Sequence, residues 1–163
     1  MRARQILVPY DGSKPSEKAL REAIRLAKYF QGNVQLLLLN VVLEIMVPAV
    51  MLESRYRSRI TGERITSAQM AKELCQQLKE SASKMLDDKK QELMEGQARD
   101  PNIATKVLLS QPVEKAIEYA DEEKVDMIAI GSIGVSGISG LKARGSVSPG
   151  IVERTKRPVL VVH

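Results

Sequence analysis

The sequence is poor in aromatic residues, cysteine and histidine, and each shortage excludes a class of protein. Its 163 residues include four tyrosines, one phenylalanine and no tryptophan, too few for a surface that stacks nucleic-acid bases. The single cysteine, Cys75, cannot form an internal disulfide, which fits a reducing compartment. The single histidine, His163, rules out two-histidine metal sites and histidine-centred catalytic triads.

Long apolar runs are also missing. The most apolar segment, LLLLNVVL at 36–43, is much shorter than the roughly 20 residues of a membrane-spanning helix. The residues before Pro9 lack the apolar stretch of a secretory signal. The net charge of +5 favours anionic ligands, but the basic residues are scattered. We therefore expect a cytoplasmic protein that partners neither membranes nor nucleic acids.

Short apolar runs alternate with helix-forming segments along the chain. A buried strand is predicted wherever an apolar run ends in turn residues, and a helix wherever apolar residues recur at helical spacing. Ser13 and Pro15 are typical of a helix start, and Ser148 is expected to cap the last helix. The predicted strands are 5–10, 34–42, 103–110, 125–131 and 158–162, and the later helices are 66–96, 112–124 and 148–155.

This order predicts the fold class α/β: a single doubly wound, five-stranded parallel sheet with helices on both faces. Residues 1–163 are expected to form one domain, because no internal repeat or linker divides them. Residues 43–65 contain Pro48 and Gly62 and are read as a surface excursion, partly helical. The helix after it carries an apolar stripe that is expected to face the core: Ala71, Leu74, Leu78, Ala82, Met85 and Leu93.

Two segments with ligand-binding chemistry follow predicted strands. Asp11-Gly12-Ser13 comes after the first strand, and GSIGVSGISGLKARGS (131–146) comes after the fourth. In open parallel sheets, ligands bind at the carboxyl ends of strands where the strand order reverses. If the first and fourth strands are neighbours, both segments border the same crevice.

The glycine-rich segment has the composition of an anion-binding loop. Glycines allow backbone N–H groups to approach phosphate oxygens, and Gly145-Ser146-Val147-Ser148 leads into a helix N-terminus, which favours negative charge. The segment matches neither GxxxxGK[ST] nor GxGxxG. The alternative is a loop tip whose serines only cap the helix.

The segments VPYDGSKPSEKAL, LLLLNVV, SQPVEKAIEYADEEKVDMIAIGS and GSVSPGIVERTKRPVLVV together resemble the universal stress protein family. The resemblance covers nearly the whole chain. In nucleotide-binding members, Gly-x2-Gly-x9-Gly-Ser/Thr wraps the phosphates of ATP. This chain has Gly131, two residues, Gly134, ten residues and then Gly145-Ser146, so its loop is one residue longer than the family pattern.

The resemblance implies a role for each matching residue. Asp11, preceded by Pro9 and Tyr10, would contact the adenine, and the Val41 backbone would read it. The phosphates, and a magnesium ion held by them, would lie along the glycine loop and the helix start. That group comprises Gly131, Gly134, Gly145, Ser146, Val147 and Ser148. The alternatives are that Asp11 only shapes its turn and that Val41 only packs in the core.

The resulting prediction is an ATP-binding regulatory protein of the universal stress response. It is expected to be a homodimer paired through 158–162, because that apolar strand would otherwise be an unpaired sheet edge. The excursion, with Tyr56 and neighbouring arginines, is a second candidate contact region. Two alternatives stay open: a dimeric scaffold that binds no nucleotide, which the longer loop favours, and a slow ATPase. A receiver-like phosphoacceptor domain is set aside, because Asp11 has no acidic neighbours.

Overall fold

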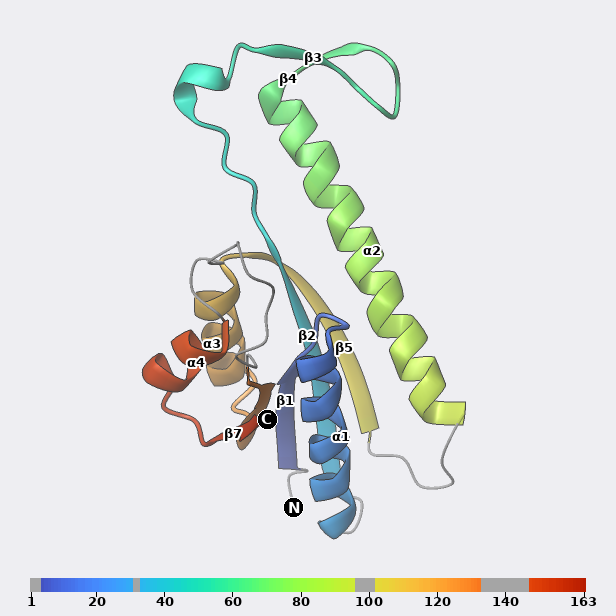
Figure 1. Ribbon diagram of the computed structural model, residues 1–163, viewed down its shortest axis with the longest axis vertical. Coiled ribbons are helices and arrows are strands. Elements are labelled where there is room, and N and C mark those ends of the chain that lie inside the picture. Colours follow the sequence, from blue (N-terminus) through green and yellow to red (C-terminus); the bar gives the residue numbers. More distant parts are fainter. Residues whose placement is uncertain (1–3, 31–32, 96–101, 133–146) are drawn as a thin grey trace.

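The computed structural model describes residues 4–30, 33–95, 102–132 and 147–163. Its main sheet contains five strands, and helices lie on either side of it (Figure 1). The strands are β1 (Arg4–Pro9), β2 (Val34–Leu43), β5 (Asn102–Ser110), β6 (Met127–Gly131) and β7 (Val159–Val162). The helices are α1 (Lys14–Tyr29), α2 (Ser67–Glu95), α3 (Pro112–Glu122) and α4 (Val147–Arg154).

All pairs in this sheet are parallel, in the order β5-β2-β1-β6-β7. From β1 the chain first builds outward through β2 to β5, and it then returns to add β6 and β7 on the other side. The order therefore reverses between β1 and β6, where Leu7 pairs with Ile128. The predicted fold class is confirmed, and the first and fourth predicted strands are neighbours.

Each face of the sheet has its own hydrophobic core. On one face, α1 and α2 pack over the sheet through residues such as Leu20, Ala23 and Leu86. On the other face, α3 and α4 pack through Ala116 and Ile151. The strands are apolar on both sides because both sides are covered, as in other doubly wound sheets.

Helix α1 begins as its sequence predicts. The Ser13 hydroxyl accepts a hydrogen bond from the Ser16 N–H at 3.4 Å, and Pro15 lies in the first turn. An N-cap serine satisfies one of the backbone donors left free at a helix start. The predicted apolar stripe of α1 is buried from Ala19 to Ala27.

Between β2 and α2 the chain forms a projection that sequence reasoning did not predict in detail. We call residues 43–66 the arm. It contains a short 3-10 helix (Ala49–Met51) and an antiparallel pair, β3 (Arg55–Arg57) with β4 (Arg64–Thr66). The expected local helix is present, but the two-stranded sheet was missed. In Figure 1 the arm and the first half of α2 extend well beyond the main sheet.

The long helix was predicted almost to its ends, but its buried stripe was predicted wrongly in the first half. Ala82 is buried, and Met85 packs on the core. Leu74 and Leu78, which were expected to face the core, are 45% and 44% exposed. The reason is geometric: the sheet does not reach that part of α2. Cys75, on the same half of the helix, is buried.

Candidate functional site

A cavity of about 380 Å³ lies where the strand order reverses, at the carboxyl ends of β1, β2 and β6. Its walls come from both faces of the sheet, because the start of α1 lies on one side and α3 and α4 lie on the other. The lining residues are Pro9, Tyr10, Asp11, Ser13, Pro15, Ser16, Leu39, Asn40, Val41, Pro112, Ala116, Ile130, Gly131, Val147 and Ser148.

The turn after β1 presents a carboxylate at the cavity rim. Gly12 has φ +77°, a left-handed conformation that glycine adopts without strain. This turn lets the Ser13 N–H donate to Asp11 Oδ1 at 3.0 Å. Partial burial would by itself raise the pKa of the Asp11 carboxyl, but hydrogen bonds from the Ser13 side chain and backbone outweigh it and lower that pKa. Asp11 is therefore an ionised hydrogen-bond acceptor near neutral pH.

Tyr10 anchors this turn beneath the cavity. Its hydroxyl donates to Glu17 Oε2 at 2.8 Å, and Lys89 Nζ of α2 lies 3.3 Å from the same oxygen. Burial, followed by the neighbouring Glu17 carboxylate, raises the pKa of Tyr10 to about 12. The Asn40 amide donates to the Tyr10 carbonyl at 2.9 Å. Tyr10, which precedes Asp11, is thus held in place by contacts from β2, α1 and α2.

Gly131 ends β6 in a place where no side chain fits. A Cβ built at this position would lie 2.3 Å from both the backbone carbon and the backbone oxygen of Pro15. Such a contact is far inside van der Waals distance. Glycine at 131 therefore lets the end of β6 approach the first turn of α1, and this approach closes the base of the cavity.

Helix α4 begins at Val147, so the prediction that Ser148 is its N-cap is wrong. Ser148 lies in the first turn, and its hydroxyl donates to the Gly131 carbonyl at 2.6 Å. The cap was predicted because a serine followed by a proline is typical of a helix start. In the structure the Ser148 hydroxyl instead bonds to a carbonyl that is distant in sequence. The hydrogen bond fastens the start of α4 to the end of β6.

The structure brings together seven of the ten predicted site residues on the wall of this cavity: Pro9, Tyr10, Asp11, Val41, Gly131, Val147 and Ser148. The other three, Gly134, Gly145 and Ser146, lie outside the described residues. Sequence reasoning did not assign Asn40 or Ser16 to the site. Asn40, a polar residue within the apolar run LLLLNVVL, is the one that the pattern could have revealed.

Neither a metal-binding cluster nor a membrane-spanning helix is found in the described part of the chain. Among those residues, no three histidine, cysteine, aspartate or glutamate side chains gather closely enough to hold a metal ion. No helix there has the length and apolar character to cross a bilayer.

The model of the universal stress protein family matches residues 2–163. The chain belongs to the universal stress protein family. A curated family member, universal stress protein YxiE of Bacillus subtilis, is 30% identical over 159 residues, which cover 98% of each chain.

Solved structures of universal stress proteins have the same fold. UspA from Lactobacillus plantarum superposes with a TM-score of 0.70 at 23% identity, covering 100% of this chain and 99% of that one. A universal stress protein in complex with cAMP has a TM-score of 0.56 at 22% identity, covering 100% and 98%. A family protein from Arabidopsis thaliana with AMP bound has a TM-score of 0.60 at 12% identity, covering 98% and 90%.

Proposed function

We propose that this protein binds an adenine nucleotide, ATP, in the cavity between β1 and β6 and acts as a regulatory module of the universal stress response. One observation carries the proposal: a carboxylate turn, the end of β2 and a helix start converge on one cavity at the reversal of strand order. Such positions are the usual ligand sites of open parallel sheets. The relatives with bound AMP and cAMP support an adenine nucleotide as the ligand class.

Each wall of the cavity suits one part of such a ligand. The ionised Asp11 carboxylate can accept a hydrogen bond from the exocyclic amine of adenine, and the Val41 backbone can pair with the ring edge. The N-terminus of α4, from Val147, offers free backbone N–H groups and a positive dipole end to phosphate. In this proposal Gly134, Gly145 and Ser146 complete the phosphate site, and Mg²⁺ is held by the phosphates.

The first experiment asks whether nucleotide is bound. The purified protein is denatured, and the supernatant is analysed for released adenine nucleotide. Nucleotide-free protein is then titrated with ATP and Mg²⁺ in a calorimeter. We expect micromolar affinity, which corresponds to about −8 kcal/mol. The absence of both released nucleotide and measurable heat would refute the proposal and favour the scaffold alternative.

A paired substitution tests the location of the phosphates. We expect Gly145→Val to weaken ATP binding at least about tenfold, because a branched side chain would obstruct the approach of backbone N–H groups to phosphate. Ser81→Val is the control: it places the same branched side chain at an exposed position of α2 that does not line the cavity. Equal affinity of the two variants would contradict the assignment of the loop.

The slow-ATPase alternative is tested in the same sample by measuring phosphate release over hours. Among the described residues that line the cavity, Asp11 is the only carboxylate, and it has no second acid or base beside it there. Rapid turnover is therefore not expected without a partner that supplies a further group.

We also propose that two copies pair through β7. The Ile128 N–H donates to the Pro158 carbonyl and the Ser132 N–H to the Val162 carbonyl. Since hydrogen-bonding directions alternate along a strand, the N–H and carbonyl groups of Val159 and Val161 point away from β6, toward the open edge. An unpaired edge of this kind is a ready template for a second strand, and a second copy supplies one.

A further inference from the structure

A group of exposed apolar residues lies on the arm and the first half of α2, outside the lining of the cavity between β1 and β6. We call its members the arm surface: Leu43, Ile45, Met46, Val50, Met51, Leu52, Tyr56, Ile60, Leu74 and Leu78. All ten are exposed; Val50 is 91% and Met46 76% exposed. Apolar residues scattered singly need no explanation, but ten on one projection do.

The arm is held in a definite shape by polar contacts. The Ser67 hydroxyl donates to the carbonyls of Met51 at 2.6 Å and Ser54 at 3.2 Å, which ties the loop to the first turn of α2. The Ser58 hydroxyl donates to Glu73 at 3.0 Å and accepts from the Ile60 N–H at 3.1 Å. These hydrogen bonds hold the arm against α2, although its apolar side chains are largely exposed.

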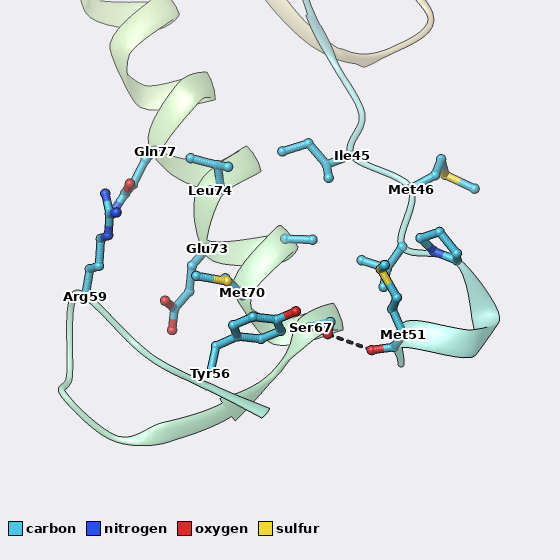
Figure 2. A pocket seen from close by; sticks show the side chains of 13 residues that line it. Ile45, Met46, Met51, Tyr56, Arg59, Ser67, Met70, Glu73, Leu74 and Gln77 are labelled. Carbon is cyan, nitrogen blue, oxygen red and sulfur yellow. Dashed lines mark hydrogen bonds between the residues drawn. The ribbon is translucent and has the colours of Figure 1, made fainter. Parts of the chain in front are cut away.

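Between the arm and α2 lies a cavity of about 460 Å³ (Figure 2). Ile45 and Leu74 point toward each other across it, and Tyr56, Met70 and Ser67 also line it. Methionines contribute three of its lining side chains, Met46, Met51 and Met70. Flexible thioether side chains adapt to a partner surface more readily than branched ones. The arm therefore carries both projecting apolar side chains and a hollow that can receive them.

The size of the arm surface suits a stable protein interface. At an average of about half exposed, the ten residues have a summed exposed area of roughly 800–1,000 Å², spread over the arm and α2, against ~300–600 Å² for the largest apolar patch of a typical monomer. A standard interface buries about 800 Å² per partner. The arm surface by itself is thus large enough for one side of such an interface.

The charge of the arm argues for a partner that is itself nearly neutral. Residues 43–66 contain four arginines and three glutamates, a net charge of +1. An anionic membrane or a nucleic acid would select a large excess of positive charge. Interspersed charges of both signs allow the same surface to meet itself without net repulsion.

We propose that the arm surface is an interface between two copies of this chain. Around a twofold axis, the same surface is used by both partners. Each copy places its projecting Val50 against the apolar hollow beside Leu74 and Leu78 of the other. Both halves of the contact exist on every chain, so no other protein is required.

This interface is separate from the pairing through β7. Helix α2 packs beside β5, which is one edge strand of the sheet, and β7 is the opposite edge. Two different twofold contacts on one chain build a closed tetramer or an open array. The assembly that the two interfaces produce together is therefore larger than a dimer.

The test on the unmodified protein measures methionine oxidation against protein concentration. Dilute peroxide oxidises exposed methionines, and mass spectrometry gives the rate at each position. We expect Met46 and Met51 to be oxidised at least about threefold more slowly when the protein is concentrated enough to associate, by mass action. Met94, which is 60% exposed at the far end of α2, is the internal control and should keep its rate.

Variants then locate the contact by sedimentation velocity. We expect the double substitution Leu74→Glu with Leu78→Glu to abolish association through the arm surface. The matched control, Met94→Glu, should associate like wild type. Both leucines are already half exposed, so the fold should survive; circular dichroism checks this. In a Val161→Pro background, which removes the edge contact, the arm dimer should persist.

Three results would overturn the proposal. One is that Met46 and Met51 of the wild-type protein are oxidised at the same rate at every protein concentration as in dilute solution. Another is a folded Leu74→Glu, Leu78→Glu protein that associates like the Met94→Glu control. The third is protection of Met46 and Met51 only by vesicles of phosphatidylglycerol, which would identify a membrane instead of a second copy.

Discussion

At the scale of single residues, Gly131 is the position whose chemistry the structure restricts most. Its missing Cβ leaves room for the Pro15 backbone, which would lie 2.3 Å away from it. We expect Gly131→Ala to destabilise the protein by about 2 kcal/mol, as overpacking of a tight contact usually does. Urea unfolding measures the loss. Gly131→Ser should cost at least as much, since its Cβ meets the same Pro15 backbone; a Gly131→Ala protein as stable as wild type would contradict the steric explanation.

Asp11 gives a prediction about pH. Because the pKa of its carboxyl is lowered in the folded protein, ionised Asp11 stabilises the fold at pH values above the ordinary carboxyl pKa of about 3.9. That contribution is lost as the pH falls through the lowered folded value. We therefore expect Asp11→Asn to reduce the free energy of unfolding at pH 7 and to match wild type at strongly acid pH. A difference that is independent of pH would contradict this.

Residue patterns predicted part of the candidate site. Asp11 and Gly131 were recognisable because they follow apolar runs at strand ends, and Ser13 because it precedes a helical pattern. The hydrogen bond from Asn40 to the Tyr10 carbonyl and the one from Ser148 to the Gly131 carbonyl join residues that are distant in sequence. No local spacing encodes such partners, because they depend on which strands become neighbours.

At the scale of elements, the hydrogen bond from Ser148 to Gly131 connects α4 to β6. We expect Ser148→Ala to destabilise the protein by about 1 kcal/mol, the usual worth of one such bond. The substitution should also weaken nucleotide binding, because it releases the helix start from the cavity wall. Chemical unfolding and calorimetry measure the two effects. Ser148→Thr retains a hydroxyl donor and should restore most of both; failure of the threonine variant would argue against the hydrogen bond as the cause.

The arm shows why element prediction failed there. β3 is RYR, with all three residues exposed, and β4 has only Ile65 buried. Neither strand shows the apolar alternation by which strands are recognised. Similarly, Leu74 and Leu78 continue the apolar stripe of α2 past the end of the sheet. Periodicity reports that a helix face is apolar, but not what covers it.

At the scale of the whole molecule, the fold of the sheet could be predicted from the sequence, and the association of two copies can be tested. The parallel strands followed from apolar runs that are buried on both faces, whereas the position of the crossover beside β1 comes from the structure, because the sequence left the neighbours of the first strand open. For assembly, we expect Val161→Pro to abolish pairing through β7 without unfolding the chain. Proline removes an N–H that points to the open edge and leaves the bonds to β6 intact.

Analytical ultracentrifugation checks this expectation, with Val161→Ala as the control that keeps the N–H. An unchanged distribution of species in Val161→Pro would show that the strand edge is not a contact. A drop in the melting temperature of several degrees would instead show that the alternation of hydrogen bonds along β7 was assigned wrongly.

Helix α2 makes contacts both beneath the Asp11 turn and at the arm. Its Met85 Sδ lies 3.0 Å from where a Cβ on Gly12 would be, and its Lys89 reaches Glu17 beneath Tyr10. From Met85 to the arm at Ser67 the helix is a stiff rod of about 27 Å. One unbroken helix therefore joins the contacts beneath the Asp11 turn to the arm.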